Sequence, residues 1–428
     1  NTEVTREVSN PRPDQARLAD LRKRLQKARL DLEAFQTSLY GAHPELKARR
    51  GEIRPIGLEE AHEMLPDARS ALLEFVVTEG KTYLFTLTKS QRSQTADLKV
   101  YVLPIKQKEL SERVERFRQQ LARRDLEFKQ SAISLYDVLL RPAREQLLNK
   151  TTLVLVPDSA LWDLPFQALQ SAPDRYLIED YGLSYAPSLT VLREMSKLRK
   201  RKAGDRTSST TLLAMGNPAL ASETVDSLKL VHRDEKLGPL PHAELEVKTL
   251  GELYGVRQSK VYVGQEARED RIKAEAGKFR VLHLATHGIL NDVSPMYSQI
   301  VLAQSAPNED GLLEAWEIMK LDLKANLVVL SACETGRGRI GAGEGMIGLS
   351  WALFVAGSPA AVVSQWKVES ASTTRLMLEF HRNLQPKIKK SQISTAQALQ
   401  GAAVKMLGSA DYRHPFYWAG FVVVGDGG

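Results

Sequence analysis

The only cysteine of the chain and one of its eight histidines each follow closely on a mostly apolar run. His287 stands two residues after the run 281–285, and Cys333 stands three residues after the run 327–330. A thiol is mostly protonated at neutral pH and needs a neighbouring base to become a good nucleophile. An imidazole supplies that base and can then protonate a leaving amine. The pair predicts nucleophilic catalysis, whereas a lone cysteine is by itself usually a small buried hydrophobic residue.

Two backbone positions beside this pair fit an oxyanion hole. Gly288 directly follows the histidine, and a residue without a Cβ lets its N–H approach a substrate oxygen closely. The N–H of Cys333 is the other natural donor. Charged residues near enough in sequence to influence substrate choice are Glu334, Asp292, Glu369 and Lys367. Their side-chain directions are not fixed by the sequence, so acidic, basic and apolar substrate side chains stay equally compatible with it.

Strands must bring both residues to one edge of a sheet. Strands are predicted at 211–215, 280–286, 300–303, 326–331, 360–365 and 420–424. Helices are predicted near 243–254, 267–277, 344–356, 370–384 and 393–407. Continuous apolar strands are typical of a mostly parallel sheet flanked by helices on both faces. Because ligands bind beyond the carboxyl ends of such strands, His287 and Cys333 face one another across a cleft if their strands are neighbours.

The part of the chain before residue 196 carries its own α/β pattern. Apolar residues at alternating three-four spacing predict one long helix over 14–40, which needs a partner surface. A short helix near 58–64 precedes a hairpin of 71–78 and 81–88 that turns at Glu79-Gly80. Further predicted elements are strands at 100–103, 152–157 and 181–187, an amphipathic helical stretch over 107–149, and a turn or short helix at 161–169.

A chain of 428 residues is too long for one compact core. We interpret residues 196–209, which are polar, basic and contain glycine, as a linker. The expected parts are a helical arm (1–65), an α/β unit with its linker (66–205) and a second α/β unit (206–428). The sequence begins with Asn1 rather than methionine, which leaves room for an upstream region.

Composition restricts the surroundings in which the chain can work. Apolar residues make up 43% and charged residues 26%, as in ordinary globular proteins. No apolar run approaches the ~18 residues of a membrane span, and no signal peptide is recognisable. The net charge of +7 sits largely in basic clusters without interleaved aromatic residues, so nucleic-acid binding is not indicated. A single cysteine excludes intramolecular disulfides, which fits a cytoplasmic location.

Three other motifs do not support a different chemistry. The segment 343–348 matches G-x-G-x-x-G, but it lies about ten residues beyond its strand, and Glu344 would repel a pyrophosphate. His283 and His287 on a strand would be ~13 Å apart, too far for one metal ion. Ser350 lies in G-L-S-W-A rather than G-x-S-x-G. We therefore expect no metal and no organic cofactor.

From about Leu58 onward the sequence resembles the CHAT family, the caspase-like peptidase domains commonly attached to tetratricopeptide repeat (TPR) arrays. Its most specific parts surround the histidine and the cysteine. The segments that carry the resemblance are TLVLVPDSALWDLPFQAL (152–169), YLIEDYGLSYAPSL (176–189), HLATHG (283–288), SPMYSQIVLA (294–303), DGLLEAWEI (310–318), LVVLSACETGRG (327–338), GEGMIGLSWALFVAGSPAAVVSQWKV (343–368) and HPFYWAGFVVVGD (414–426).

The resemblance implies a caspase-like sandwich in the clan of caspases, separases and gingipains, which cleave peptide bonds with a His-Cys dyad. It places His287 and Cys333 in the dyad, at about the spacing of 50 residues seen in caspases, and the amides of Gly288 and Cys333 in the oxyanion hole. The first unit has no comparable pair and would be a degenerate caspase-like unit. The chain departs from many relatives at 367–370, where K-V-E-S replaces a stretch with an aspartate.

The end of the strand 361–366 is similar to a caspase segment that lines the first substrate pockets. We interpret this strand as an edge strand beside the cleft, able to pair with an extended substrate. Ser364, Gln365 and Trp366 would then contact substrate, with Glu334 near them. The alternative is that Trp366 is only a core aromatic residue.

Together these features predict a cysteine endopeptidase that cleaves a partner protein. The resemblance suggests a bacterial defence, cell-death or signalling system, and an upstream helical-repeat region or regulatory protein as partner. The alternative is a latent or inactive caspase-like interaction scaffold, because a fold by itself does not imply an activity.

Overall fold

The computed structural model describes residues 7, 14–27, 56–89, 96–203, 211–221, 237–291, 295–304, 309–332, 344–366, 368–385 and 393–428. Residues 15–27 are helical, which confirms that part of the helix predicted at 14–40. Residues 28–40 of that prediction lie outside the described part.

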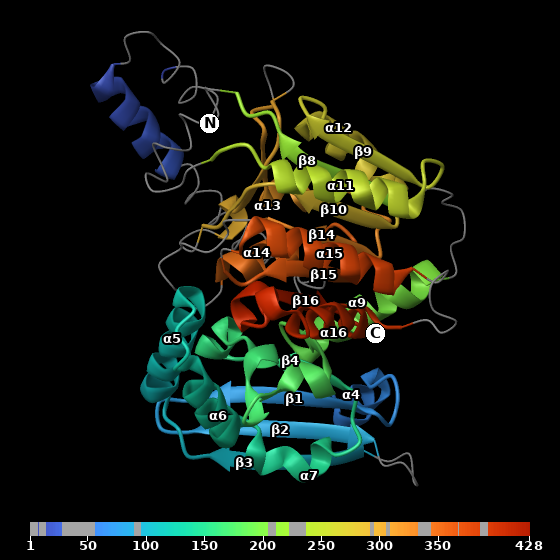
Figure 1. Cartoon of the computed structure of the whole chain (residues 1–428). Coiled ribbons are helices and arrows are strands. Elements are labelled where there is room, and N and C mark those ends of the chain that lie inside the picture. Colours follow the sequence, from blue (N-terminus) through green and yellow to red (C-terminus); the bar gives the residue numbers. More distant parts are fainter. Residues whose placement is uncertain are drawn as a thin grey trace.

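Eleven strands form one sheet in the order β3-β2-β1-β4-β7-β16-β15-β14-β10-β8-β9 (Figure 1). These strands are β1 (Ser70–Val77), β2 (Thr82–Lys89), β3 (Ala96–Leu103), β4 (Thr152–Val156), β7 (Gly182–Tyr185), β8 (Leu212–Pro218), β9 (Ser259–Gly264), β10 (Val281–Ala285), β14 (Leu327–Leu330), β15 (Ala360–Ser364) and β16 (Phe421–Gly425). Only β1–β2, β2–β3 and β15–β16 pair antiparallel. The predicted mostly parallel α/β sheet is confirmed.

Helices cover both faces of this sheet. Side by side on one face lie α11 (Pro241–Tyr254), α15 (Ser370–Leu384) and α16 (Thr395–Leu407) (Figure 1). The opposite face carries α4 (Leu58–Met64), α9 (Leu189–Ala203), α12 (Glu269–Glu275), α13 (Ala315–Ile318) and α14 (Glu344–Val355). Neighbouring residues of β4 show the division, because Leu155 packs in the main core with Leu399 while Val154 packs with Leu65 and Leu192.

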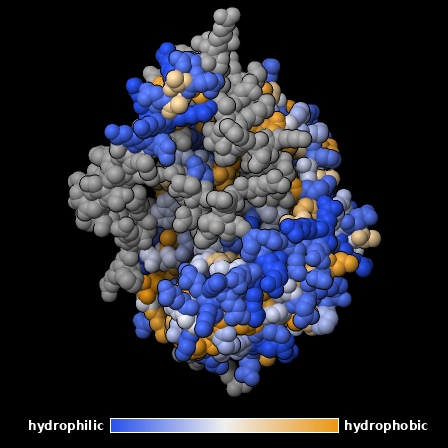
Figure 2. Space-filling view, turned by 90° about the vertical axis from the view of Figure 1, so that its left-hand side faces the viewer, coloured by the Kyte–Doolittle hydropathy of each residue, from blue (hydrophilic) through white to orange (hydrophobic). Residues whose placement is uncertain are grey.

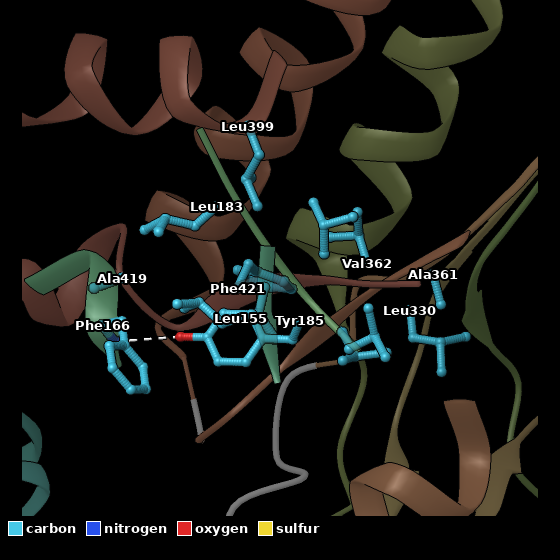
Figure 3. Close-up of a cluster of buried hydrophobic side chains, with 14 of the residues drawn as sticks. Leu155, Phe166, Leu183, Tyr185, Leu330, Ala361, Val362, Leu399, Ala419 and Phe421 are labelled. Carbon is cyan, nitrogen blue, oxygen red and sulfur yellow. Dashed lines mark hydrogen bonds between the residues drawn. The ribbon is translucent and has the colours of Figure 1, made fainter. Parts of the chain in front are cut away.

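The main core explains why the strands are apolar throughout. Every residue of β14, β15 and β16 is buried, as a sheet covered on both faces requires. Figure 3 shows one part of this core, in which Tyr185 lies among Leu155, Leu183 and Phe421. The hydroxyl of Tyr185 accepts a hydrogen bond from the Phe166 N–H at 3.2 Å. Burial raises the pKa of this tyrosine, so it remains a neutral core residue.

Residues 70–185 and 212–425 supply the two halves of the sheet, which meet where β7 pairs with β16. Side chains reinforce this junction. Gln167 contacts Gln365 across it, with 3.4 Å between Nε2 and Oε1, and Arg118 donates to the Gln365 carbonyl at 3.3 Å. The division into units at residue 205 stays a prediction, and the two units of that prediction would be neighbouring parts of one sheet.

The helical stretch predicted over 107–149 is interrupted. It comprises α5 (Gln107–Arg123), α6 (Phe128–Leu139) and α7 (Arg144–Leu147). Arg124 adopts a left-handed backbone with φ 56° and ends α5, and Arg141–Ala143 form a separate turn that contains Pro142. The amphipathic pattern identified the helices but not these breaks.

The interpretation of 196–209 as a linker was wrong for residues 196–203, which form the second half of α9. Met195 on this helix is buried against Phe354 of α14. Lys202, at its end, donates to the carbonyls of Leu323 (2.9 Å), Ala325 (2.8 Å) and Gly357. Lysine and arginine are good helix formers, so the basic composition that indicated a linker is equally compatible with a helix whose apolar side is packed.

A second, three-stranded sheet was not fully predicted. It consists of β11 (Gly288–Ile289), β12 (Gln299–Val301) and β13 (Leu312–Glu314), all antiparallel. Only β12 was expected, because it overlaps the apolar run 300–303, whereas β11 has two residues and β13 ends at the charged Glu314. This small sheet begins at the residue after His287 and therefore fixes the chain just beyond β10.

On the side shown in Figure 2, hydrophilic residues cover much of the described surface and hydrophobic residues form small patches between them. Within the described ranges, no helix combines the length and the apolar character that crossing a membrane demands.

Candidate active site

His287 lies between the main sheet and the small sheet and is 2% exposed. Its carbonyl accepts a hydrogen bond from the Val301 N–H at 2.9 Å. The hydroxyl of the preceding Thr286 donates to the Val301 carbonyl. Backbone and side-chain contacts with β12 therefore hold this turn in place on both sides of the histidine.

The imidazole of His287 is oriented by a backbone carbonyl. Nε2 lies 2.8 Å from the carbonyl oxygen of Gly238, in the segment that leads into α11. A carbonyl oxygen only accepts, so Nε2 carries the proton of this hydrogen bond. In the neutral ring the lone pair is then on Nδ1, which is the atom able to take a proton from a nucleophile. Gly238 was not identified from the sequence, because nothing local marks a carbonyl that acts on a residue 49 positions away.

Gly288 presents its N–H away from the small sheet. The hydrogen bond between Val301 and His287 makes those two residues a bonded pair of the antiparallel ladder. The next pair, Gly288 and Ile300, is then a non-bonded pair, in which each N–H points away from the other strand of the pair. An N–H that points away from the ladder is compatible with an oxyanion donor, and this role of Gly288 stays a prediction.

β10 and β14 are neighbours and pair in parallel, with Leu284 opposite Leu330. His287 and Cys333 were expected to face one another only if their strands were neighbours, and β10 and β14 are neighbours. Beyond β14, Ser331 and Ala332 are buried. Cys333 and Glu334 themselves lie outside the described residues.

A pocket opens at the carboxyl ends of β10, β14 and β15. The cavity inside it is small, about 20 Å³, which is room for about one water molecule. The described residues that line it are all uncharged and mostly aliphatic: Leu284, Thr286, Gly288, Leu290, Ile300, Leu330, Ala332, Leu349, Val363 and Ser364. The pocket thus touches both sequence neighbours of His287 and the residue that precedes Cys333.

The prediction that the strand 361–366 is an edge strand was wrong. β15 lies between β14 and β16 and pairs with both, because β16 returns antiparallel beside it. A substrate therefore cannot add to this strand, although the residues beyond it stay candidates.

The three residues at the end of β15 have different surroundings. Ser364 lines the pocket, and its hydroxyl lies 3.4 Å from the Ala332 carbonyl. Gln365 donates from Nε2 to the Trp162 carbonyl at 3.0 Å, toward the first half. Trp366 is 7% exposed and belongs to the main core. A substrate contact by Gln365 or Trp366 stays a prediction.

A chain of buried polar side chains includes His283, which lies on β10 four residues before His287. Nε2 of His283 is 2.7 Å from Glu246, Nδ1 of His283 is 3.0 Å from Nε2 of His381, and Nδ1 of His381 is 3.0 Å from the Tyr254 hydroxyl. One set of donors satisfies every contact with both rings neutral: tyrosine to His381, His381 to His283, and His283 to Glu246. Burial, with a smaller contribution from His283, holds the pKa of His381 well below its usual range.

This polar chain connects β10 to the two helices beside the site. Glu246 belongs to α11, which begins three residues after Gly238, and His381 belongs to α15. Sequence analysis rejected a metal site at His283 and did not identify the partners of this residue. A signal was present, because Glu246 precedes Leu250 and Tyr254 by four and eight residues and so occupies the buried side of its helix.

Among the described residues, one group of carboxylates is close enough to share a metal ion: Glu269, Glu309 and Glu317. The Lys273 ammonium lies 2.8, 2.6 and 2.9 Å from them and already pairs with all three carboxylates. Burial raises the pKa of Glu269 to about 7. Burial would lower the pKa of Lys273, but its three carboxylate partners outweigh that effect and raise it. Glu269 also accepts from the Gly311 N–H at 2.9 Å, so this cluster braces the small sheet.

Comparisons with known proteins agree with this architecture. Tetratricopeptide repeat protein 28 from Homo sapiens is 28% identical over 354 residues, which are 71% of this chain and 13% of that protein. The Mus musculus protein of the same name is 28% identical over 338 residues, 68% of this chain and 13% of its own length. This chain thus spans about an eighth of these relatives.

A solved structure of similar fold is the separase–securin complex of Saccharomyces cerevisiae. It aligns with a TM-score of 0.50 and 11% identity, covering 89% of this chain and 30% of that one. The likeness concerns the fold alone, which is caspase-like as the sequence predicted. The sequence model of the CHAT domain matches residues 129–426, well over half of the chain. The chain therefore belongs to the CHAT domain family.

Proposed function

We propose that the chain is a cysteine endopeptidase in which Cys333 and His287 form the dyad. The observation that carries the proposal is the parallel register of β10 and β14, with Leu284 opposite Leu330. Each proposed catalytic residue comes three positions after one member of this pair. Adjacent strands are about 4.8 Å apart, so the strands that lead to the two residues run side by side in register up to this pair.

The contacts of His287 support a role in proton transfer. With Nε2–H held by the Gly238 carbonyl, Nδ1 takes the proton of the Cys333 thiol. The thiolate then attacks the scissile carbonyl carbon and forms a tetrahedral intermediate. The N–H groups of Gly288 and Cys333 stabilise its oxyanion. His287 returns its proton to the leaving amine, and water hydrolyses the acyl-enzyme in a second cycle of the same steps.

The substrate we propose is a partner protein rather than proteins in general. A repeat region is named in the relatives, of which this chain spans 13%, so a helical-repeat region or a regulatory protein is the proposed context for control. A cytoplasmic defence, cell-death or signalling role rests on the family resemblance alone. A scaffold that binds without cleaving is the competing function, and the experiment below separates the two.

The test is cleavage of a mixed peptide library, followed by mass spectrometry of the new termini. The wild-type chain is compared with Cys333→Ala and His287→Ala, and folding of each is checked by circular dichroism. We expect new termini only with the wild type, with a loss of at least about 1,000-fold in each variant. Cleavage that persists in Cys333→Ala would refute the proposed nucleophile. A folded wild type that cleaves nothing, with Cys333 alkylated equally fast when His287 is absent, would favour the scaffold.

A further inference from the structure

We propose that Asn217, near the end of β8, is a positioning residue for His287, because it fixes the segment whose Gly238 carbonyl orients the imidazole. The inference rests on the proposed peptidase function, in which His287 is the base. It adds a residue that acts on the dyad through the backbone rather than by direct contact. No motif in the sequence identified it.

Asn217 lies at the carboxyl end of a strand that neighbours the strand of His287. β8, β10 and β14 are consecutive in the sheet, and β8 pairs in parallel with β10, with Gly216 opposite Ala285. Asn217 and His287 come one and two residues beyond this pair. The backbone of Asn217 is left-handed, with φ 47°, a conformation that asparagine adopts more readily than most residues. A local departure from strand geometry thus coincides with the residue we assign.

The side-chain amide of Asn217 bridges two points at the start of α11. Its Oδ1 accepts from the Leu240 N–H at 2.7 Å, and its Nδ2 donates to Oε2 of Glu244 at 2.8 Å. A backbone N–H only donates and a carboxylate only accepts, so these partners fix the orientation of the amide. Hydrogen bonds from Lys248 and from Asn217 lower the pKa of Glu244, which keeps this acceptor ionised. The N-cap residue and the first turn of α11 are therefore tied to the end of β8.

The chain between this bridge and His287 is short and stiff. Gly238 is separated from Leu240 only by Pro239, and Pro241 follows. A proline ring locks its own φ and restricts the residue before it, so these four residues move little relative to one another. A displacement of Leu240 therefore displaces the Gly238 carbonyl, whose oxygen lies 2.8 Å from Nε2 of His287.

Packing holds α11 against β8 but does not by itself fix its direction. A Cβ on Gly216 would lie 2.8 Å from the Ala243 carbonyl oxygen and 2.8 Å from Cγ2 of Val247, so the helix and the strand are in close contact. Such contact sets the distance between the two elements, whereas hydrogen bonds depend on direction as well. The two bonds of Asn217 therefore determine where the Gly238 carbonyl points.

The experiment measures the tautomer of His287 in the full chain. The protein is labelled with ¹⁵N-histidine, the ring nitrogen shifts are recorded with the ring neutral, and His287→Gln assigns the signals. We expect the Nε2–H form in the wild type. Asn217→Gly removes both hydrogen bonds but permits a left-handed backbone, and it should lower the ratio of the Nε2–H to the Nδ1–H form about 5-fold, as for the loss of one hydrogen bond. Asn149→Gly is the matched control, because Asn149 is also left-handed (φ 64°) but lies before β4 in the first half. It should leave the ratio unchanged.

A second pair of variants reverses the polarity of the bridge. Asn217→Asp keeps the acceptor for Leu240 but sets two carboxylates against each other, and it should also lower the ratio about 5-fold. Adding Glu244→Gln supplies an amide that donates in the opposite direction, and it should restore the ratio to within about 2-fold of wild type. Cleavage of the peptide library should be lost and regained in parallel. Folding is checked by circular dichroism, and this pair carries the test if Asn217→Gly does not fold.

The outcomes separate this inference from the proposed function. An unchanged ratio in folded Asn217→Gly, an equal shift in Asn149→Gly, or no recovery on adding Glu244→Gln would each overturn the role of Asn217 and leave the peptidase standing. The dyad is tested separately by the rate at which iodoacetamide alkylates Cys333, the only thiol of the chain. If this rate is the same without His287 while the tautomer ratio responds as expected, the peptidase proposal fails and the control of the His287 ring by Asn217 stands.

Discussion

Acidification should destabilise the protein through His381, the central ring of the buried polar chain. This ring is fully buried, and burial keeps its pKa far below the usual value. An unfolded histidine titrates near pH ~6.5. Because the folded pKa is the lower one, the neutral ring contributes stability that is fully present above pH ~6.5. That contribution is lost as the pH falls toward the folded pKa.

The size of the effect follows from linkage. At pH 5.5 the unfolded ring is about 90% protonated, whereas the folded ring stays neutral. Since one pKa unit corresponds to about 1.4 kcal/mol, the change from pH 7.5 to 5.5 removes about 1.4 kcal/mol of unfolding free energy through this residue. The other histidines contribute their own changes, so the effect must be measured as a difference between two proteins.

The assay is urea unfolding of the wild type and His381→Gln at both pH values. Glutamine keeps a donor that can reach His283 but does not titrate. The destabilisation caused by the substitution should be about 1.4 kcal/mol smaller at pH 5.5 than at pH 7.5. Leu376→Val is the matched control, because Leu376 is buried on the same helix and has no titratable group. A pH-independent effect of His381→Gln would refute the conclusion that the folded ring stays neutral.

Two further substitutions, each with a control, test a buried ammonium at the end of α9 and a close backbone contact just before β16. Lys202→Met leaves three backbone carbonyls without their ammonium partner and should lower the unfolding free energy by about 1–3 kcal/mol. Its control is Lys200→Met, on the exposed side of α9, which should stay within about 0.5 kcal/mol of wild type. Gly420→Ala places a Cβ 2.6 Å from Cγ1 of Val368 and should cost about 1–3 kcal/mol. Gly80→Ala meets nothing within 4 Å and is its control. Equal stability within either pair would show that the contact in question is not needed.

The elements that bury apolar residues on both sides were the most predictable from the sequence. The core strands β14 and β15 are short apolar runs, and both were predicted within one residue at each end. α15 was predicted with the bounds it has, since a glutamate caps its start and a clear apolar side runs along it. Local patterns suffice in these cases because burial itself creates the pattern.

Which strands pair with one another could not be predicted from the sequence. β9 is mostly half-buried at the edge of the sheet and carries no strong pattern, so it was missed. β16 was predicted as a strand, but its place between β15 and β7 follows from topology. For the site, type and spacing led to the histidine, the cysteine and the adjacent glycine, whose roles stay predictions. They did not lead to the Gly238 carbonyl or the partners of His283, because each meets its target only after the chain has folded.

The two halves of the protein are joined through hydrogen bonds between β7 and β16 rather than through a hinge. A partner that binds the first half therefore cannot activate the site by rotating that half away, because doing so would break a ladder in the middle of the sheet. Any influence of the first half on His287 within the sheet would have to cross β16, β15 and β14, the strands that stand between β7 and β10.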